Sequence, residues 1–380
     1  MGARRYLGPV AAAAVALAAL AGCGPGDLGH PGYRPQRPPP TMPTTTSSTA
    51  PSPGKASAWA TLATIPVGPL VTLVGGPGAV YALPSDVGFD HTVPLPVQVV
   101  RVAVPSRAET ESKPITGASA MAVSGNSLWV VASSDVGATN LTVTLDQLDA
   151  TTLTLRRSIH LSADPISRPE TIAAVPGGPL WVGIGKHLYR VDPAKGTVTA
   201  TFTAPGYLAG LAVSPDDTVL YAAGAQANGA GLTVTERNAV SGATLATASH
   251  PESVVGGSVS ATTAGVWASF RTGMLGDTIF LRRADLRQVV PSAGMTLNLA
   301  SRLVAAMGVQ GTVSHGVLWL SNFQTLACAD PTTGQVRSSE QLKVGVAGQV
   351  VASPGAIYVV GGPGIEVIAP PRACGVAGAA

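Results

Sequence analysis

An apolar segment centred on an aromatic residue recurs seven times between residues 58 and 374. Each instance predicts a short strand, because it is a run of about five mostly apolar residues bounded by turn residues. The spacings between successive aromatic residues are 48, 52, 40, 46, 52 and 39 residues, which indicates a repeat unit. The seven aromatic residues are Tyr81, Trp129, Trp181, Tyr221, Trp267, Trp319 and Tyr358.

The flanks of each aromatic segment are also alike. A strand of small residues precedes it, as in Leu211–Asp217, and further strands follow it. The turn Asp192-Pro-Ala-Lys-Gly196 recurs as Asp330-Pro-Thr-Thr-Gly334 and, loosely, as Asn238–Gly242. Asp can accept hydrogen bonds from its own backbone, Pro sets φ and Gly supplies a positive φ, so these segments predict hairpin turns. Each repeat therefore predicts four short antiparallel strands, as in one blade of a β-propeller.

The sequence predicts an all-β fold, a seven-bladed β-propeller of four-stranded antiparallel blades, with the aromatic residues packed between neighbouring blades. A solenoid is the alternative, but it would need polar end caps, and none is evident. The last repeat has no good fourth strand, since Cys374–Ala380 is rich in Gly and Ala. We expect Ala58–Pro66 to form the outer strand of the last blade, because closing the ring with both termini removes an open edge.

Two of the repeats resemble the YVTN, NHL and virginiamycin-B-lyase group of bacterial propellers. Val213-Ser-Pro-Asp-Asp-Thr-Val-Leu-Tyr221 is similar to the recurring "VSPDG…LYV" phrase of those proteins, with Asp217 in place of the Gly. Leu180-Trp181-Val182, with Asp192-Pro193 downstream, is similar to their "LWV…IDP.TG" phrase. The resemblance implies architecture and not one activity, because these families host varied functions on one scaffold.

Residues 1–22 have the features of a bacterial lipoprotein signal peptide. Met1–Arg5 is basic, and a stretch of Ala, Val and Leu follows it. Leu20-Ala21-Gly22-Cys23 then resembles the bacterial lipobox. The resemblance implies cleavage before Cys23 and lipidation of its thiol, and two acyl chains are enough for stable anchoring. An ordinary secretory signal and a short membrane anchor are the alternatives.

Residues 23–57 predict a tether. The part after Cys23 holds nine Pro among clustered Thr and Ser without aliphatic periodicity, which is typical of a disordered linker with polyproline character. We therefore divide the chain into a signal peptide at 1–22, a lipidated tether at 23–57 and a propeller domain at 58–380.

Charge and cysteine content narrow the function classes. Charged residues are 11% of the chain, against about 25% in typical soluble domains, and the net charge is +3. Such a surface neutralises few phosphates, so we expect no nucleic-acid binding. After Cys23 there is no run of about 18 apolar residues, which argues against a polytopic membrane protein. Cys328 and Cys374 predict either a disulfide in an oxidising compartment or two buried free thiols.

The connections between second and third strands share one face of a propeller, and here their lengths are uneven. They are long at Pro84–His91, Ser133–Asn140, Gly224–Gly231 and Arg271–Asp277, and nearly absent in the third and sixth repeats. Such a one-sided rim predicts a binding site on a rigid scaffold, and solvated turn residues are the alternative. The polar candidates are Asp86, Asp90, His91, Asp135, Gln226, Asn228, Arg271 and Asp277.

Two other segments carry weaker signals. Arg107–Lys113 is the densest charge cluster and predicts a solvated loop between blades, with a partner contact as the alternative. Pro291–Met307 is longer than a blade junction needs, and its loose apolar stripe predicts a short helix.

Local catalytic motifs are absent from the sequence. The six His never pair at i, i+2 or i, i+4, and there is no His-Glu-x-x-His, Cys-x-x-Cys or Gly-x-Ser-x-Gly. We therefore expect no metal and no cofactor. A site assembled from several blades would escape such a search, and His91, His187 and His315 fall in or near second-to-third connections.

These observations favour a non-catalytic propeller anchored through Cys23 on the extracytoplasmic side of the cell membrane. It would bind a protein, a glycan or a small ligand on one face. The first alternative is an extracytoplasmic enzyme of the lyase or lactonase kind, with a site distributed over several blades. The second is an assembly protein that acts through an apolar rim.

Overall fold

The structure is a computed structural model of the 380-residue chain. It describes residues 59–68, 70–84, 96–134, 142–162, 170–226, 231–250, 257–272, 275–289, 310–321, 325–342, 346–361 and 364–375. The chain divides into two units, Met1–Ser52 and Pro53–Ala380, and every described residue belongs to the second unit.

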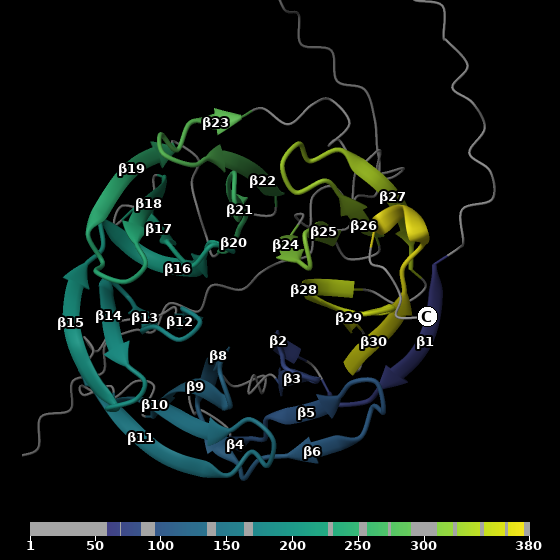
Figure 1. Cartoon of the computed structure of the whole chain (residues 1–380), viewed down its shortest axis with the longest axis horizontal. Helices are drawn as coiled ribbons and strands as arrows, with labels where there is room; N and C mark the ends of the chain where they lie inside the picture. The colour runs from purple at the N-terminus through teal and green to yellow at the C-terminus, as the bar shows by residue number, and fades with distance from the viewer. Residues whose placement is uncertain are drawn as a thin grey trace, which may run out of the picture. The chain divides into compact units, whose positions relative to one another are not determined.

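Seven four-stranded antiparallel sheets form a closed ring around a central axis (Figure 1). The innermost strand of each sheet contacts the innermost strand of the next, and β28 contacts β2 to complete the circle. The chain is a seven-bladed β-propeller, as the repeat predicts. Blades are numbered here in chain order from the sheet that contains β2.

The strands at each radial position are as follows, in order of blades 1 to 7. The innermost strands are β2 (Leu70–Gly76), β8 (Ala118–Ser124), β12 (Glu170–Ala174), β16 (Gly206–Val213), β20 (Gly257–Ala261), β24 (Gln310–Ser314) and β28 (Val346–Ser353). The second strands are β3 (Ala79–Pro84), β9 (Ser127–Ser134), β13 (Leu180–Ile184), β17 (Val219–Gln226), β21 (Gly265–Thr272), β25 (Val317–Ser321) and β29 (Ala356–Gly361). The third strands are β5 (Val100–Ala103), β10 (Thr142–Asp149), β14 (His187–Asp192), β18 (Leu232–Asn238), β22 (Leu275–Arg282), β26 (Thr325–Ala329) and β30 (Gly364–Ala369). The outermost strands are β6 (Glu109–Glu111), β11 (Leu155–Ser162), β15 (Thr197–Thr203), β19 (Thr244–His250), β23 (Gln288–Val289), β27 (Val336–Gln341) and β1 (Ala60–Ile65).

The N-terminal strand completes the last blade. β1 pairs antiparallel with β30, from Ala60 opposite Ala369 to Ile65 opposite Ile365. The prediction for Ala58–Pro66 is thereby confirmed, with the strand itself spanning Ala60–Ile65. Strands from the two ends of the described chain share one sheet, so the blade that closes the ring has four strands like the other six.

The aromatic residues lie at the interfaces between blades, as predicted. All seven are at most 2% exposed. Each belongs to a different apolar cluster, and each cluster joins one blade to the next. Trp319 of blade 6, for example, packs with Val350 and Ile357 of blade 7. The recurring aromatic position therefore supplies the core of each blade-to-blade contact.

The predicted hairpin turns have the expected hydrogen bonds. Asp192 Oδ1 accepts from the backbone N–H groups of Ala194 and Lys195, at 2.9 and 3.0 Å. Asp330 does the same two and three residues ahead, and so does Asn238. Gly196 closes the first turn with a φ of +69°, a conformation that glycine adopts without strain.

The expectation that Arg107–Lys113 is a loop between blades is wrong. Glu109–Glu111 forms β6, the outermost strand of blade 1, where Thr110 lies opposite Arg101. Charged side chains are a common protection for an edge strand, so the cluster marks a strand edge instead of a connection. A short pair, β4 (Pro96–Val97) with β7 (Ile115–Thr116), lies beside this blade. Pro291–Met307, the expected helix, lies outside the described residues.

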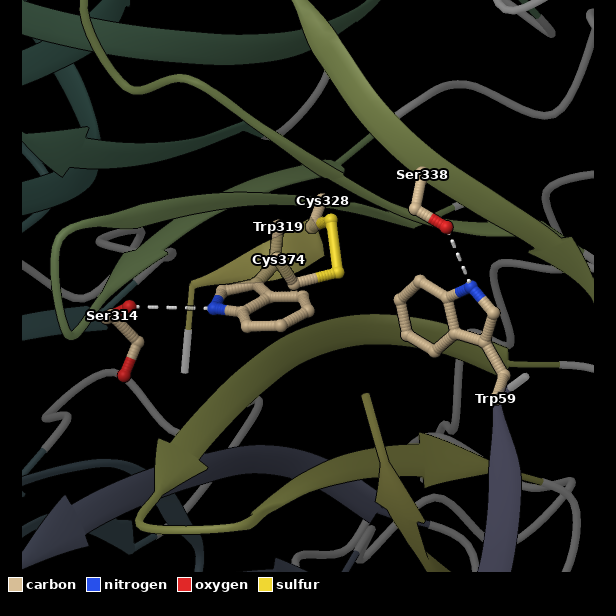
Figure 2. Close-up of a disulfide and its surroundings, with 6 residues drawn as sticks. All are labelled: Trp59, Ser314, Trp319, Cys328, Ser338 and Cys374. Atoms are coloured by element: carbon tan, nitrogen blue, oxygen red, sulfur yellow. Dashed lines mark hydrogen bonds between the residues drawn. A yellow bond between two sulfur atoms is a disulfide. The ribbon is translucent and has the colours of Figure 1, made fainter. Parts of the chain in front are cut away.

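A disulfide connects the last two blades (Figure 2). Cys328 lies in β26 of blade 6, and Cys374 lies in the 3₁₀ turn η2 (Arg372–Cys374), which follows the last strand of blade 7. Their Cα atoms are 5.6 Å apart, within the ordinary range for a disulfide. The bond therefore attaches the end of the described chain to the neighbouring blade. No helix in the described ranges has the length and apolar character needed to span a membrane.

Candidate functional site

The axis of the propeller is lined by strands that carry almost no charge. Among the seven innermost strands, the only charged residue is Glu170, at the start of β12. The remaining positions are aliphatic residues, Gly, Ser, Thr and Gln, with Met121 and Tyr207. Within the described residues, no group of three or more His, Cys, Asp or Glu is arranged to hold a metal ion. The axis thus offers hydrogen-bonding groups and apolar surface.

A hollow of about 760 Å³ opens at one end of this axis, between blades 6, 7 and 1. Its walls include residues 73–80, 312–315 and 349–354, which are the ends of three innermost strands and the turns that follow them. The volume is in the range of small-molecule binding sites, about 300–1,000 Å³. Among the described residues of its lining there is no Asp, Glu, Lys or Arg, and His315 is the one ionisable side chain.

The polar groups of the hollow are held in place by contacts between blades. Gln349 Oε1 of blade 7 accepts hydrogen bonds from the Thr72 hydroxyl and from the Leu73 N–H of blade 1, the latter at 2.9 Å. Ser314 Oγ of blade 6 accepts from the N–H of Ala352 at 3.1 Å. The Gln349 amide N–H groups have no acceptor among the described residues. They remain able to donate to a carbonyl or hydroxyl oxygen of a ligand.

The hollow lies on the face opposite the predicted rim. It is built from turns between first and second strands, whereas the predicted rim consists of connections between second and third strands, at the other end of each blade. His315 belongs to the hollow: it lies in the turn between β24 and β25, so its expected place near a second-to-third connection is wrong. Its φ of +51° is that of a tight turn. His187 begins β14, beside a second-to-third connection, as expected.

The structure describes three of the eight residues that the sequence places on the predicted rim. Arg271 and Asp277 lie within β21 and β22, where Arg271 is opposite Gly276 and Phe270 is opposite Asp277. The expected long connection is therefore wrong here, because the paired strands extend to Thr272 and Leu275, with two residues between them. Gln226 ends β17. The candidates outside the described residues are Asp86, Asp90, His91, Asp135 and Asn228.

Comparison with known proteins identifies the architecture and no family. No protein-family model matches the sequence, and no curated protein matches it. Among solved structures, the computationally designed Ika8 protein is similar, with 12% identity, a TM-score of 0.52, and 81% of this chain and 98% of that chain covered. BamB from Moraxella catarrhalis is also similar, with 12% identity and a TM-score of 0.53. The match covers 82% of this chain and 99% of that chain.

The hydrazine synthase of Kuenenia stuttgartiensis is similar to the same degree. It has 12% identity and a TM-score of 0.54, with 82% of this chain and 98% of that chain covered. The likeness establishes the fold. At 12% identity it shows nothing further, since a designed protein and a chain named for an enzyme share it equally.

Proposed function

We propose that this chain is a lipid-anchored, extracytoplasmic β-propeller that binds a neutral ligand at the hollow between blades 6, 7 and 1, without catalysing a reaction. The observation that carries the proposal is the sparsely charged axis: one charged residue in the seven innermost strands, and no Asp, Glu, Lys or Arg among the described residues that line the hollow. General acid–base and metal-assisted catalysis usually combine several ionisable groups at the reacting atoms, and His315 is the one such side chain among the described residues of the lining. Recognition of a neutral ligand needs fixed donors, acceptors and apolar surface instead.

The ligand that fits best is an uncharged, oxygen-rich one, such as a neutral glycan or the backbone of an extended peptide. The Gln349 amide offers donors, and the Thr312 and Ser353 side chains on the lining add hydroxyl groups. Carbonyl groups of the turns can accept from ligand hydroxyl or amide groups. The pre-formed hydrogen bonds between blades reduce the ordering cost of binding.

The envelope location rests on two features of the chain. Leu20-Ala21-Gly22-Cys23 supplies a lipidation signal, followed by a tether long enough to hold a domain away from a membrane. The disulfide between Cys328 and Cys374 supports the same location, because such bonds persist in oxidising compartments. Together they favour the outer side of a cell membrane.

Site-specific photo-crosslinking in a bacterial envelope tests this proposal. The full chain carries a photoreactive amino acid at Thr312, in the hollow, or at Thr247, an exposed residue of outermost strand β19, as the matched control. We expect a discrete adduct from position 312 and none from position 247. The Thr312→Trp variant, which fills the hollow, should lower adduct formation from a photoreactive residue at Ser353 in the same lining, whereas Thr247→Trp should leave that adduct unchanged.

The same cells test the anchor. Cys23→Ala should abolish incorporation of a labelled fatty acid and release the chain from the membrane fraction, whereas Cys374→Ala should leave the label unchanged. Equal crosslinking from both positions, or a stoichiometric metal ion in the purified protein, would argue against a neutral-ligand site. Label retained in the Cys23→Ala variant would argue against lipidation.

A further inference from the structure

A second cavity lies on the outside of the ring, between the outermost strands of blades 6 and 7. Its volume is about 240 Å³, and its lining includes Trp59, Glu340, Leu342, Glu366 and Ile368. Small-molecule sites usually begin near about 300 Å³, so this cavity suits one side chain or a small amine rather than a larger ligand. It shares no lining residue with the hollow at the axis.

The carboxylate of Glu366 is buried in this cavity, and the described residues place no cation beside it. The residue is 4% exposed, and both carboxylate oxygens lie 3.0 Å from Thr64 Oγ1. A hydroxyl has a single proton to donate, whereas a carboxylate has about four acceptor positions. Among the described residues, no Lys or Arg lines the cavity and none forms an ion pair with Glu366. A buried carboxylate gains most from a positively charged partner.

An indole ring lines the same cavity and is held rigidly. Trp59 Nε1 donates to Ser338 Oγ at 3.1 Å, and its ring meets that of Trp319 edge to face at 6.3 Å (Figure 2). Leu342 and Ile368 add apolar wall, and the exposed Glu340 adds a second acidic group. An aromatic face, an apolar wall and a buried carboxylate are together complementary to an alkyl chain with a cationic end.

We propose that this cavity, between β1 and β27, binds the alkylammonium or guanidinium end of a ligand. Glu366 is its counter-ion, Trp59 contacts its alkyl chain or its charge, and Glu340 attracts it at the surface. The inference stands apart from the neutral-ligand site, because it uses a different cavity and the opposite chemical selectivity. The cation would come either from a free amine or from a Lys or Arg side chain of a partner protein.

Titration of the ¹⁵N-labelled full chain tests the proposal through the Trp59 indole N–H signal. n-Butylammonium is the probe, and n-butanol is the neutral control of similar length. We expect butylammonium to shift the Trp59 signal saturably, butanol to leave it unchanged, and added salt to weaken the binding. The Trp59→Phe variant assigns the signal among the five tryptophans.

Charge-removing variants decide the role of each carboxylate. Glu366→Gln should weaken butylammonium binding by about tenfold or more, because it removes the charge and keeps the shape of the side chain. Glu340→Gln should weaken it less, because that residue is exposed. Circular dichroism and the melting temperature confirm that each variant folds. N-acetyl-lysine methylamide distinguishes the sources, since tighter binding than that of butylammonium indicates a protein side chain, and equal binding indicates a free amine.

The proposal is overturned if butanol shifts the signal as strongly as butylammonium, which would make the cavity a purely apolar one. It is also overturned if the folded Glu366→Gln variant binds as tightly as the parent. Neither result depends on the outcome of crosslinking at the axis.

Discussion

The aromatic residue of the second strand donates a hydrogen bond to the next blade at three interfaces in the described part of the chain. Trp181 Nε1 donates to the Ala239 carbonyl at 2.8 Å, and Tyr81 and Trp267 make the equivalent bonds to Ala150 and Pro331. Each acceptor follows the Asp or Asn of a third-to-fourth turn. At these interfaces, the recurring turn therefore supplies the carbonyl that accepts the hydrogen bond of the recurring aromatic residue.

The interface of blades 2 and 3 breaks this pattern. Arg157 donates to the Pro193 carbonyl, and its guanidinium lies 5.7 Å from the centre of the Trp129 ring. Trp129 Nε1 is buried without a hydrogen-bond partner. Arg157 therefore binds the Pro193 carbonyl, which corresponds to the carbonyls that accept from Trp181 and Trp267 at their interfaces.

This difference gives a prediction with a built-in control. Trp181→Phe should destabilise the propeller by about 1–2 kcal/mol more than Trp129→Phe, because only the first leaves a buried carbonyl without its donor. Both variants remove the same volume, and both tryptophans are 0% exposed, so the cost of the lost packing is comparable. Denaturant unfolding followed by far-ultraviolet circular dichroism measures the two free energies of unfolding. Equal losses would show that the indole hydrogen bond contributes nothing.

Two terminal elements hold blades 6 and 7 together. β1 pairs with β30, and Trp59, just before β1, donates to Ser338 of β27 in the neighbouring blade. At the other end, the disulfide attaches η2 to β26 across 46 positions of sequence. Both ends of the described chain thus contact blade 6 while completing or following blade 7.

Loss of the disulfide should cost about 4 kcal/mol in the free energy of unfolding, the chain-entropy value for a closed loop of this length. Cys328→Ala, Cys374→Ala and the double variant should lose similar amounts, because each breaks the same bond. Thermal and denaturant unfolding measure these losses. If the two single losses add in the double variant, the cysteines act as independent buried thiols.

Carboxylates recur on one face of the whole ring, in the turns between third and fourth strands. Backbone N–H groups of Thr152 and Thr151 hold the pKa of Asp149 down to about 2. The Arg282 guanidinium and a backbone N–H lower the pKa of Asp285 to about 2 as well. Backbone hydrogen bonds also depress the pKa values of Asp192 and Asp330. Four blades thus carry an acid that folding favours in its charged form.

These pKa values predict a loss of stability in acid. An unfolded Asp has a pKa of about 3.9, so the folded state binds these protons more weakly than the unfolded state. The stabilisation is complete above that value and is lost as the pH falls from about 4 through 2. We expect the melting temperature to fall over that interval, and less steeply in the Asp149→Asn, Asp285→Asn double variant. A melting temperature that is flat down to pH 2 would contradict the assignment.

Local sequence patterns predict the backbone conformation at Asp217 correctly but not the hairpin at Arg271–Asp277. The resembled phrase has Gly where this chain has Asp217, and the backbone there has a φ of +58°, the conformation that glycine favours. By contrast, the repeat pattern predicts a long connection at Arg271–Asp277, yet the two sides of this segment pair in register as strands. Cross-strand pairing outweighed local composition at that hairpin.

The amino-acid sequence by itself determined the number of blades, the aromatic position at each interface and the strand that closes the ring. Those features follow from the spacing of apolar residues and turns, which is local information repeated seven times. Only the tertiary structure decided which surfaces became cavities and which polar groups were left unsatisfied. Thr64 and Glu366 meet across 302 positions of sequence, and Gln349 meets Leu73 across 276. Such contacts arise only when the ring closes, because closure, and no local pattern, brings these strands together.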